Sequence, residues 1–215
     1  MAAVLDDFRT APIEPPLRAA LSFLEVLAKE PWRVHASALA PMRDAGLDDQ
    51  AIEDVLAVGS AFAAAVRIAD ALGFTAPAKR DAFMMKHTLR RGYESRNAIA
   101  DGFPRHHAGA LMVQEAVLDA SGPTERGLRV DLTRWAEAHV RGESPQDDAL
   151  PEALRVLVGK EVRHAYRIVD EDLEALVEAG WEGEALFDVV VVVAVGTAVA
   201  RYELGLRAIQ GGAST

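Results

Sequence analysis

The chain has 215 residues, of which 50% are apolar and 26% are charged, a composition typical of a soluble globular protein with a sizeable core. Its net charge of −10 argues against nucleic acid or an anionic membrane surface as a partner, because phosphate binding needs basic patches. The chain has no cysteine, which excludes disulfides, thiolate catalysis and zinc–sulfur sites.

The first residues, "MAAVLDDFRTAPIEPP", carry acidic residues where a secretory signal would need a basic start followed by an apolar stretch. We therefore expect a cytoplasmic protein.

In chain order, the sequence predicts helices and no convincing strand, which indicates an all-α fold. Pro104 and the pair Gly122-Pro123 separate the middle helices, and residues 142–151, "GESPQDDALP", are typical of a linker. The predicted helices cover residues 17–30, 37–46, 52–72, 78–93, 106–121, 129–142, 150–166, 170–180 and 187–209.

The most apolar stretch, "FDVVVVVAVGTAVARYELGLRAI", contains five consecutive valines. Only twelve residues, Val189 to Ala200, are free of charge in a row, fewer than the roughly 20 that a membrane-spanning helix needs. We therefore expect no membrane span. A run this short does not by itself distinguish a buried strand from a buried helix.

An internal repeat decides between these two alternatives. Residues 44–74 match residues 178–208 at a constant offset of 134, and nine of the 28 positions from Ala45 to Leu72 are identical in the two copies. The first copy is rich in alanine and leucine and has no turn signal, so it is helical by propensity. We therefore predict that the valine copy is also a helix, buried nearly all round. The most informative identities are Gly46/Gly180, Asp54/Asp188 and Arg67/Arg201.

Each copy begins with a short helix, for which Ser37 and Asp170 are the predicted N-caps and Gly46 and Gly180 the predicted stops. Glu171 and Asp172 would then lie in the first turn of the second short helix, where carboxylates suit the helix dipole. Each copy is thus predicted to be a helical hairpin.

The duplicated charges suggest a structural lock between the copies. If the two long helices pack antiparallel around a pseudo-twofold axis, Asp54 would meet Arg201 and Asp188 would meet Arg67. We state this as a hypothesis.

These features resemble the carboxymuconolactone decarboxylase and alkylhydroperoxidase AhpD-like family. The resemblance rests on a helix, an "AG" turn and a long small-residue helix ending in Arg. The segments "RIADALGF", "LRRGYE" and "RHAYRIVDEDLEALVEAGW" resemble its peroxidase-related branch. It covers roughly residues 15–95 and 150–210. It implies a first AhpD-like half at 1–95, a helical connector at 96–148, a second half at 149–215 and assembly into homo-oligomers.

The chain departs from the family at its catalytic motif. Members that reduce peroxides use a Cys-x-x-Cys pair followed by a histidine, and the resemblance would place the thiols of the second copy near Ala165 and Ile168, with the histidine near Asp172. In the first copy the same positions fall at Pro31, Val34 and Ala38. Without cysteine, thiol peroxidase activity is excluded.

The segment "EVRHAYR" offers other chemistry. Glu161 and His164 are three residues apart, so on a helix they share a face and could form a carboxylate–imidazole pair for proton transfer. Arg163, Tyr166 and Arg167 are candidates for binding a substrate carboxylate. The alternative is that His164 packs against a neighbouring helix and the charges form a solvated face.

Two other clusters invite a functional reading. His106 and His107 are adjacent, so they would point apart on a helix, and a position in a loop or at a helix N-terminus is expected instead of a metal site. A cluster of basic residues is interpreted as a solvated face of an acidic protein. We expect no metal and no cofactor. The basic cluster comprises Lys86, His87, Arg90 and Arg91.

Two functions remain open. One is a cysteine-free AhpD-like protein that binds a small metabolite or acts on it by acid–base chemistry. The other is a non-catalytic helical scaffold whose apolar helices form oligomer interfaces.

Overall fold

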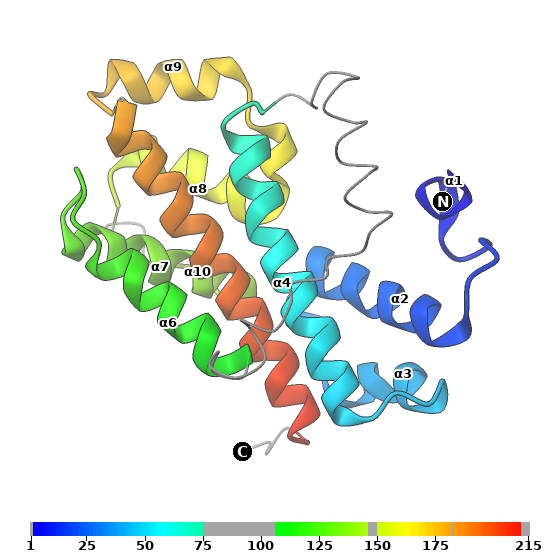
Figure 1. The fold of residues 1–215 in the computed structure, drawn as a ribbon. Coiled ribbons are helices and arrows are strands. Elements are labelled where there is room, and N and C mark those ends of the chain that lie inside the picture. Colours follow the sequence, from blue (N-terminus) through cyan, green and yellow to red (C-terminus); the bar gives the residue numbers. More distant parts are fainter. Residues whose placement is uncertain (1, 75–105, 146–149, 182, 212–215) are drawn as a thin grey trace, which may run out of the picture.

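The computed structural model describes residues 2–74, 106–145, 150–181 and 183–211. Within these ranges every regular element is a helix, so the predicted all-α class is confirmed (Figure 1). The α-helices are α1 (Ala2–Asp7), α2 (Pro15–Lys29), α3 (Ala40–Asp44), α4 (Asp49–Ala71), α6 (His106–Asp119), α7 (Arg126–Arg141), α8 (Glu152–His164), α9 (Asp170–Glu178) and α10 (Gly183–Ile209). Short 3₁₀ turns are η1 (Pro31–Arg33), η2 (Ala36–Leu39) and η3 (Ala165–Arg167). The predicted helix at 78–93 lies outside the described residues.

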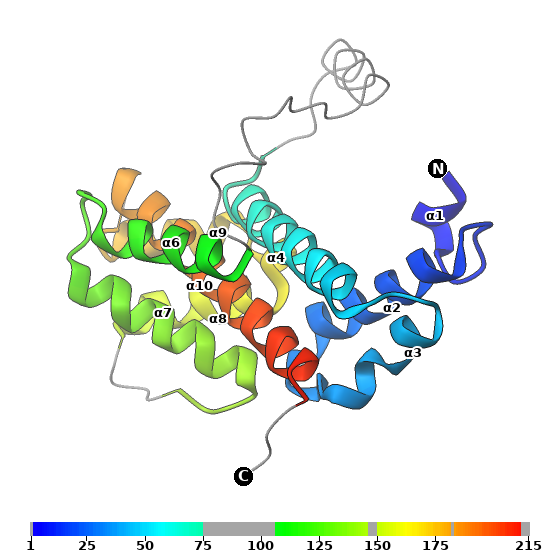
Figure 2. The same cartoon turned by 60° about the horizontal axis from the view of Figure 1, so that its bottom comes forward.

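Two long helices organise the molecule. α4 and α10 run side by side in opposite directions, with α6 and α7 on one side of them and α2 and α3 on the other (Figures 1 and 2). Their axes approach closely, because a Cβ added at Gly205 of α10 would lie 2.2 Å from a Cδ atom of the buried Leu56 of α4. This close contact brings the two long helices together near the C-terminal end of α10.

The valine run is helical, as predicted. It lies in α10, where most positions from Val189 to Tyr202 are buried. Valine favours strands by intrinsic propensity. Here the apolar surroundings on nearly every side of α10 outweigh that preference, since burial of each large apolar side chain contributes roughly 1.5–3 kcal/mol.

The length argument against a membrane segment does not hold for α10 as a whole. The helix has 27 residues, and it is the one helix among the described residues that is long and apolar enough to cross a membrane. In its most apolar window 61% of the residues are buried inside the protein, a property that core helices share. Packing against α4, α6, α7 and α8 accounts for this burial.

The turns after α3 and α9 have the same construction. Gly46 and Gly180 have φ angles of +92° and +90° and end the two helices, as predicted. In each turn the residue after the glycine donates to the carbonyl five positions back, Leu47 to Met42 at 3.1 Å and Trp181 to Leu176 at 2.8 Å. Both are therefore Schellman motifs.

The two N-cap predictions are wrong. Ser37 lies inside η2, and Asp170 is the first residue of α9, with Val169 at the N-cap position. The side chain that caps α9 belongs to Asp172, which accepts a hydrogen bond from the Val169 amide at 3.0 Å. The carboxylates of the first turn are present as expected.

The crossed ion pairs are also wrong. Asp188 accepts a hydrogen bond from Nε of Arg129 at 3.0 Å and another from the hydroxyl of Thr124. Asp54 is exposed and contacts Nε2 of His106 at 2.8 Å. The duplicated aspartates therefore have different roles, one in a buried ion pair and one on the surface.

The core consists of two apolar clusters joined by α4 and α10. One is built on α7, α8 and the first half of α10, and the other on α2, α3, the first half of α4 and the end of α10. Four buried polar residues of the two long helices belong to neither cluster: Ser60, Arg67, Thr197 and Arg201.

We expect Gly180→Ala to lower the free energy of unfolding by about 1–2 kcal/mol, because an alanine at positive φ is strained even though nothing lies within 4 Å of the added Cβ. The matched control is Gly127→Ala in α7, which also has open space but helical geometry and should stabilise by up to about 1 kcal/mol. Urea unfolding measures both changes. Equal effects at the two positions would contradict this account of the turn.

We expect Asp188→Ala to destabilise the protein by about 3 kcal/mol, because it leaves the buried Arg129 without its carboxylate. Asp54→Ala, at the corresponding position of the first sequence copy, should stay within about 0.5 kcal/mol of wild type because Asp54 is exposed. Chemical denaturation of both variants is the measurement. A large loss of stability in Asp54→Ala would contradict this expectation, because it would mean that the surface contact to His106 stabilises the fold.

Candidate functional site

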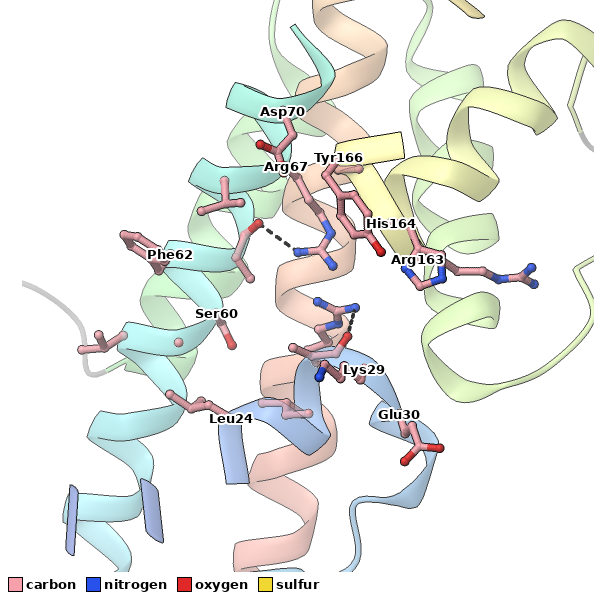
Figure 3. A pocket seen from close by; sticks show the side chains of 18 residues that line it. Leu24, Lys29, Glu30, Ser60, Phe62, Arg67, Asp70, Arg163, His164 and Tyr166 are labelled. Carbon is pink, nitrogen blue, oxygen red and sulfur yellow. Dashed lines mark hydrogen bonds between the residues drawn. The ribbon is translucent and has the colours of Figure 1, made fainter. Parts of the chain in front are cut away.

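A cavity of about 830 Å³ lies where α2, α4, η3 and α10 meet (Figure 3). Its walls are mostly apolar, and its charged groups come from separate parts of the chain. The apolar walls include Leu24, Leu27, Val58, Phe62, Ala63 and Val66. Such a size and lining are typical of sites for small organic ligands.

Arg67 enters this cavity from the last third of α4 (Figure 3). Its side chain donates to the carbonyl of Ala63 at 3.0 Å and to the carbonyl of Val162 at 3.2 Å. Its Nε atom is buried and has no hydrogen-bond partner. Burial lowers the pKa of Arg67, while the carboxylates of Glu161 and Asp70 act in the opposite direction.

Arg201 reaches the same cavity from α10 and is 3% exposed. Its Nη2 donates to the carbonyl of Ala28 at 2.8 Å and to the carbonyl of Val162 at 3.3 Å. Its Nε and Nη1 atoms are buried and have no hydrogen-bond partner among the described residues. Burial, together with the positive charge of Arg67, lowers the pKa of Arg201 to about 9.

The two guanidinium groups therefore share one carbonyl oxygen, that of Val162. Two like charges held together away from water are unfavourable unless an anion lies nearby. Three of their nitrogen atoms lack a partner in the described part of the protein. The two arginines thus bring positive charge to the cavity that they line, and three of their buried N–H groups have no acceptor among the described residues.

An acidic side chain, that of Glu161, lies beside only one of these two arginines, Arg67. Glu161 is 0% exposed, and neither carboxylate oxygen has a hydrogen-bond partner among the described residues. Burial raises the pKa of Glu161 well above its ordinary value, and the charge of Arg67 opposes that rise. Leu27 occupies the corresponding position near Arg201, 134 residues earlier in the chain.

The predicted pair between Glu161 and His164 does not form. His164 is the last residue of α8 and has φ −149° and ψ 63°, so it has left the helical geometry that would align side chains three residues apart. His164 is exposed at the edge of the cavity, and its ring lies 5.7 Å from that of Tyr166. Burial, together with the charges of Arg167 and Arg163, lowers its pKa.

The other three predicted residues surround the mouth of the cavity rather than its interior. Arg163 and Tyr166 line it but are exposed. Arg167 is exposed, stacks its guanidinium 5.7 Å from the Tyr166 ring and does not line the cavity. The segment chosen from the sequence therefore contributes the rim of the site.

From the sequence, the two central residues, Arg67 and Arg201, are assigned to a structural lock and not to a site. An arginine repeated inside the most apolar helices is the sequence signal for such a site, because a charge in such a helix must be compensated somewhere. Ser60, buried and without a partner for its hydroxyl, gave no sequence signal.

His106 is the first residue of α6, as expected, and binds Asp54, while His107 stacks against Tyr202 with ring centroids 6.0 Å apart. No group of three or more histidine or acidic side chains in the described residues could hold a metal ion. The basic residues between 86 and 91 lie outside the described part of the chain.

Comparisons with known proteins add no assignment: no family model, no curated protein and no solved structure matches this chain.

The raised pKa of Glu161 predicts a pH-dependent difference between wild type and Glu161→Gln. Above the ordinary pKa of 4.5 the folded protein keeps a proton that the unfolded chain has released, so wild-type stability falls as the pH rises towards the folded-state pKa. Glutamine does not titrate. We expect the stability of Glu161→Gln relative to wild type to be constant below about pH 4 and to increase as the pH rises above it, as followed by thermal melting.

The control is Glu184→Gln in the first turn of α10, where the side chain is exposed. Its melting temperature relative to wild type should stay nearly constant over the same pH range. If the melting temperature of Glu161→Gln relative to wild type were also constant over this pH range, Glu161 would not be a buried protonated carboxyl.

Proposed function

We propose that this protein binds a small organic acid, with the carboxylate of the ligand held between Arg67 and Arg201 and its apolar part against the walls of the cavity. The observation that carries the proposal is a pair of buried arginines that line one cavity, with three guanidinium nitrogen atoms that have no hydrogen-bond partner among the described residues.

Carboxylate is the anion that fits these donors best. Arginine forms short, charge-assisted hydrogen bonds to carboxylate oxygens, which are roughly twice as strong as neutral ones. A carboxylate would offset the repulsion between the two cations and satisfy nitrogen atoms that otherwise remain unpaired. The apolar lining excludes a strongly hydrated anion without a carbon skeleton as the preferred ligand.

We further propose that the chain is a cysteine-free variant of the AhpD-like helical fold. Support comes from backbone hydrogen bonds that recur at the offset of 134, in the Schellman turns at Gly46 and Gly180. Arg67 donates to Val162, and Arg201 donates to Ala28, which is the position equivalent to Val162. These contacts are what a tandem duplication with a pseudo-twofold axis would give.

Binding is better supported than acid–base catalysis. Glu161 does not line the cavity, and His164 forms no hydrogen bond to a carboxylate among the described residues. The rim residues Arg163 and Tyr166 would then attract an acid and cover its outer end.

One observation favours the alternative of a self-associating scaffold. Val58 and Phe62 are one turn apart on α4 and are 69% and 70% exposed, more than isolated core-type side chains usually are. A second copy covering this face would shield them. The oligomeric state measured by analytical ultracentrifugation, with Phe62→Ser as the variant, tests this alternative.

We expect octanoate to bind wild type in isothermal titration calorimetry, and Arg201→Met or Arg67→Met to weaken binding by at least about tenfold, because each variant removes charge-assisted hydrogen bonds. Arg207→Met, at an exposed position on the same helix as Arg201, should bind as wild type does. Uncharged 1-octanol should bind much more weakly than octanoate. Affinity for octanoate should also fall above about pH 9, where Arg201 loses its proton.

If octanoate bound the arginine variants as well as wild type, or bound no better than octanol, the cavity would not be a carboxylate site. Circular dichroism and melting curves of each variant show that it is folded before the affinities are compared.

A further inference from the structure

A second cavity lies on the other side of α4, between α4, α6 and α10. It has a volume of about 660 Å³ and is lined largely by alanine, glycine and valine. From α4 come Ala57, Ala61 and Ala64, and from α10 come Val195, Ala198 and Val199. Because these side chains are small, an apolar space remains between the three helices, and no large side chain of the described residues occupies it.

The helix α6 packs loosely over this space and leaves it open. None of its residues is buried, although it carries Leu111, Met112 and Val113 in a row. Gly109, Ala110 and Val113 line the cavity from α6. The helix therefore lies over α4 and α10 without closing the gap between them.

The two titratable side chains that line this cavity, His106 and Tyr202, are each paired with a carboxylate. Tyr202 donates its hydroxyl to Glu53 at 2.8 Å, and His106 contacts Asp54 at 2.8 Å. No arginine or lysine of the described residues lines the cavity. A charged ligand would thus find no free opposite charge here.

One polar group remains open. Ser60 is 7% exposed, its hydroxyl has no hydrogen-bond partner among the described residues, and it lines this cavity as well as the first one. A buried hydroxyl without a partner costs roughly 1–3 kcal/mol, and it can donate to a ligand or accept from one. The other polar side chains that line the cavity, Gln50, His106 and Tyr202, already make hydrogen bonds, so Ser60 provides the directional contact that a ligand could use.

We propose that the cavity between α4, α6 and α10 is a second ligand site, which takes an uncharged, mainly apolar molecule whose one hydrogen-bonding group meets the Ser60 hydroxyl. This site lies on a different side of α4 from the carboxylate site, and the two share only Ser60. Arg67 and Arg201 line the first cavity, whereas no arginine or lysine of the described residues lines the second.

Adjacent alanines on α4 allow a matched test. Ala64 lines the second cavity and Ala63 lines the first, and both are half-buried. The probe is N-phenyl-1-naphthylamine, an uncharged aromatic amine whose fluorescence rises in apolar surroundings. We expect wild type to bind it, Ala64→Leu to weaken binding by at least about tenfold by filling the space, and Ala63→Leu to bind it as wild type does.

The same two variants are then titrated with octanoate. For this ligand Ala63→Leu should weaken binding, whereas Ala64→Leu should bind as wild type does. Ser60→Ala should weaken binding of the amine several-fold and preserve the melting temperature within a few degrees. Circular dichroism confirms that each variant is folded.

Three outcomes would overturn the second site: no binding of the amine by wild type, loss of binding in Ala63→Leu but not in Ala64→Leu, or equal loss in both, which would indicate one continuous cavity. Failure of octanoate to bind, with the amine still sensitive to Ala64→Leu, would overturn the carboxylate site alone.

Discussion

The structure depends on how two buried guanidinium groups are held at the contact between α4 and α10. Arg67 and Arg201 both donate to the Val162 carbonyl and each takes a further carbonyl, one within its own helix and one from α2. Backbone carbonyls neutralise no charge, so these bonds orient the cations without compensating them. The fold therefore carries an electrostatic cost at its centre, and an anionic ligand is the simplest species that would relieve it.

The burial of apolar surface in the clusters on either side offsets this electrostatic cost. α10 passes through both clusters, and its valines bury surface on nearly every side. The close approach of Gly205 to Leu56 fixes the distance between the two long helices near one end. Between the clusters the helices are lined by small residues, which leave space beside α4 instead of a filled core. The helices α4 and α10 are closely packed near their ends and border open space in their middle turns. These two features are compatible because they involve different turns of the same helices.

Local features of this fold could be predicted from the sequence, whereas tertiary partners could not. Helix positions and the stops at Gly46 and Gly180 follow from propensity and from the need for positive φ, which are properties of short segments. The partner of Asp188 is Arg129, 59 residues away, and nothing in the local pattern distinguished it from Arg67. The pair of Glu161 with His164 failed because α8 ends at His164, and a boundary shifted by one residue changes which side chains share a face.

The asymmetry between the two sequence copies indicates where an anion would lie. Val162 and Ala28 lie 134 residues apart, the offset that also relates Arg201 to Arg67, and Val162 accepts a hydrogen bond from Arg67 while Ala28 accepts one from Arg201. The residue before Val162 is Glu161, whereas the residue before Ala28 is Leu27, so a carboxyl group lies beside Arg67 and an apolar side chain takes its place beside Arg201. Among the described residues Arg201 also has two unpaired nitrogen atoms, compared with one for Arg67. Because burial raises the pKa of Glu161, this carboxyl compensates Arg67 only where it is ionised, whereas the leucine offers Arg201 no acidic group at any pH. A ligand carboxylate would take the place that a second glutamate would otherwise fill.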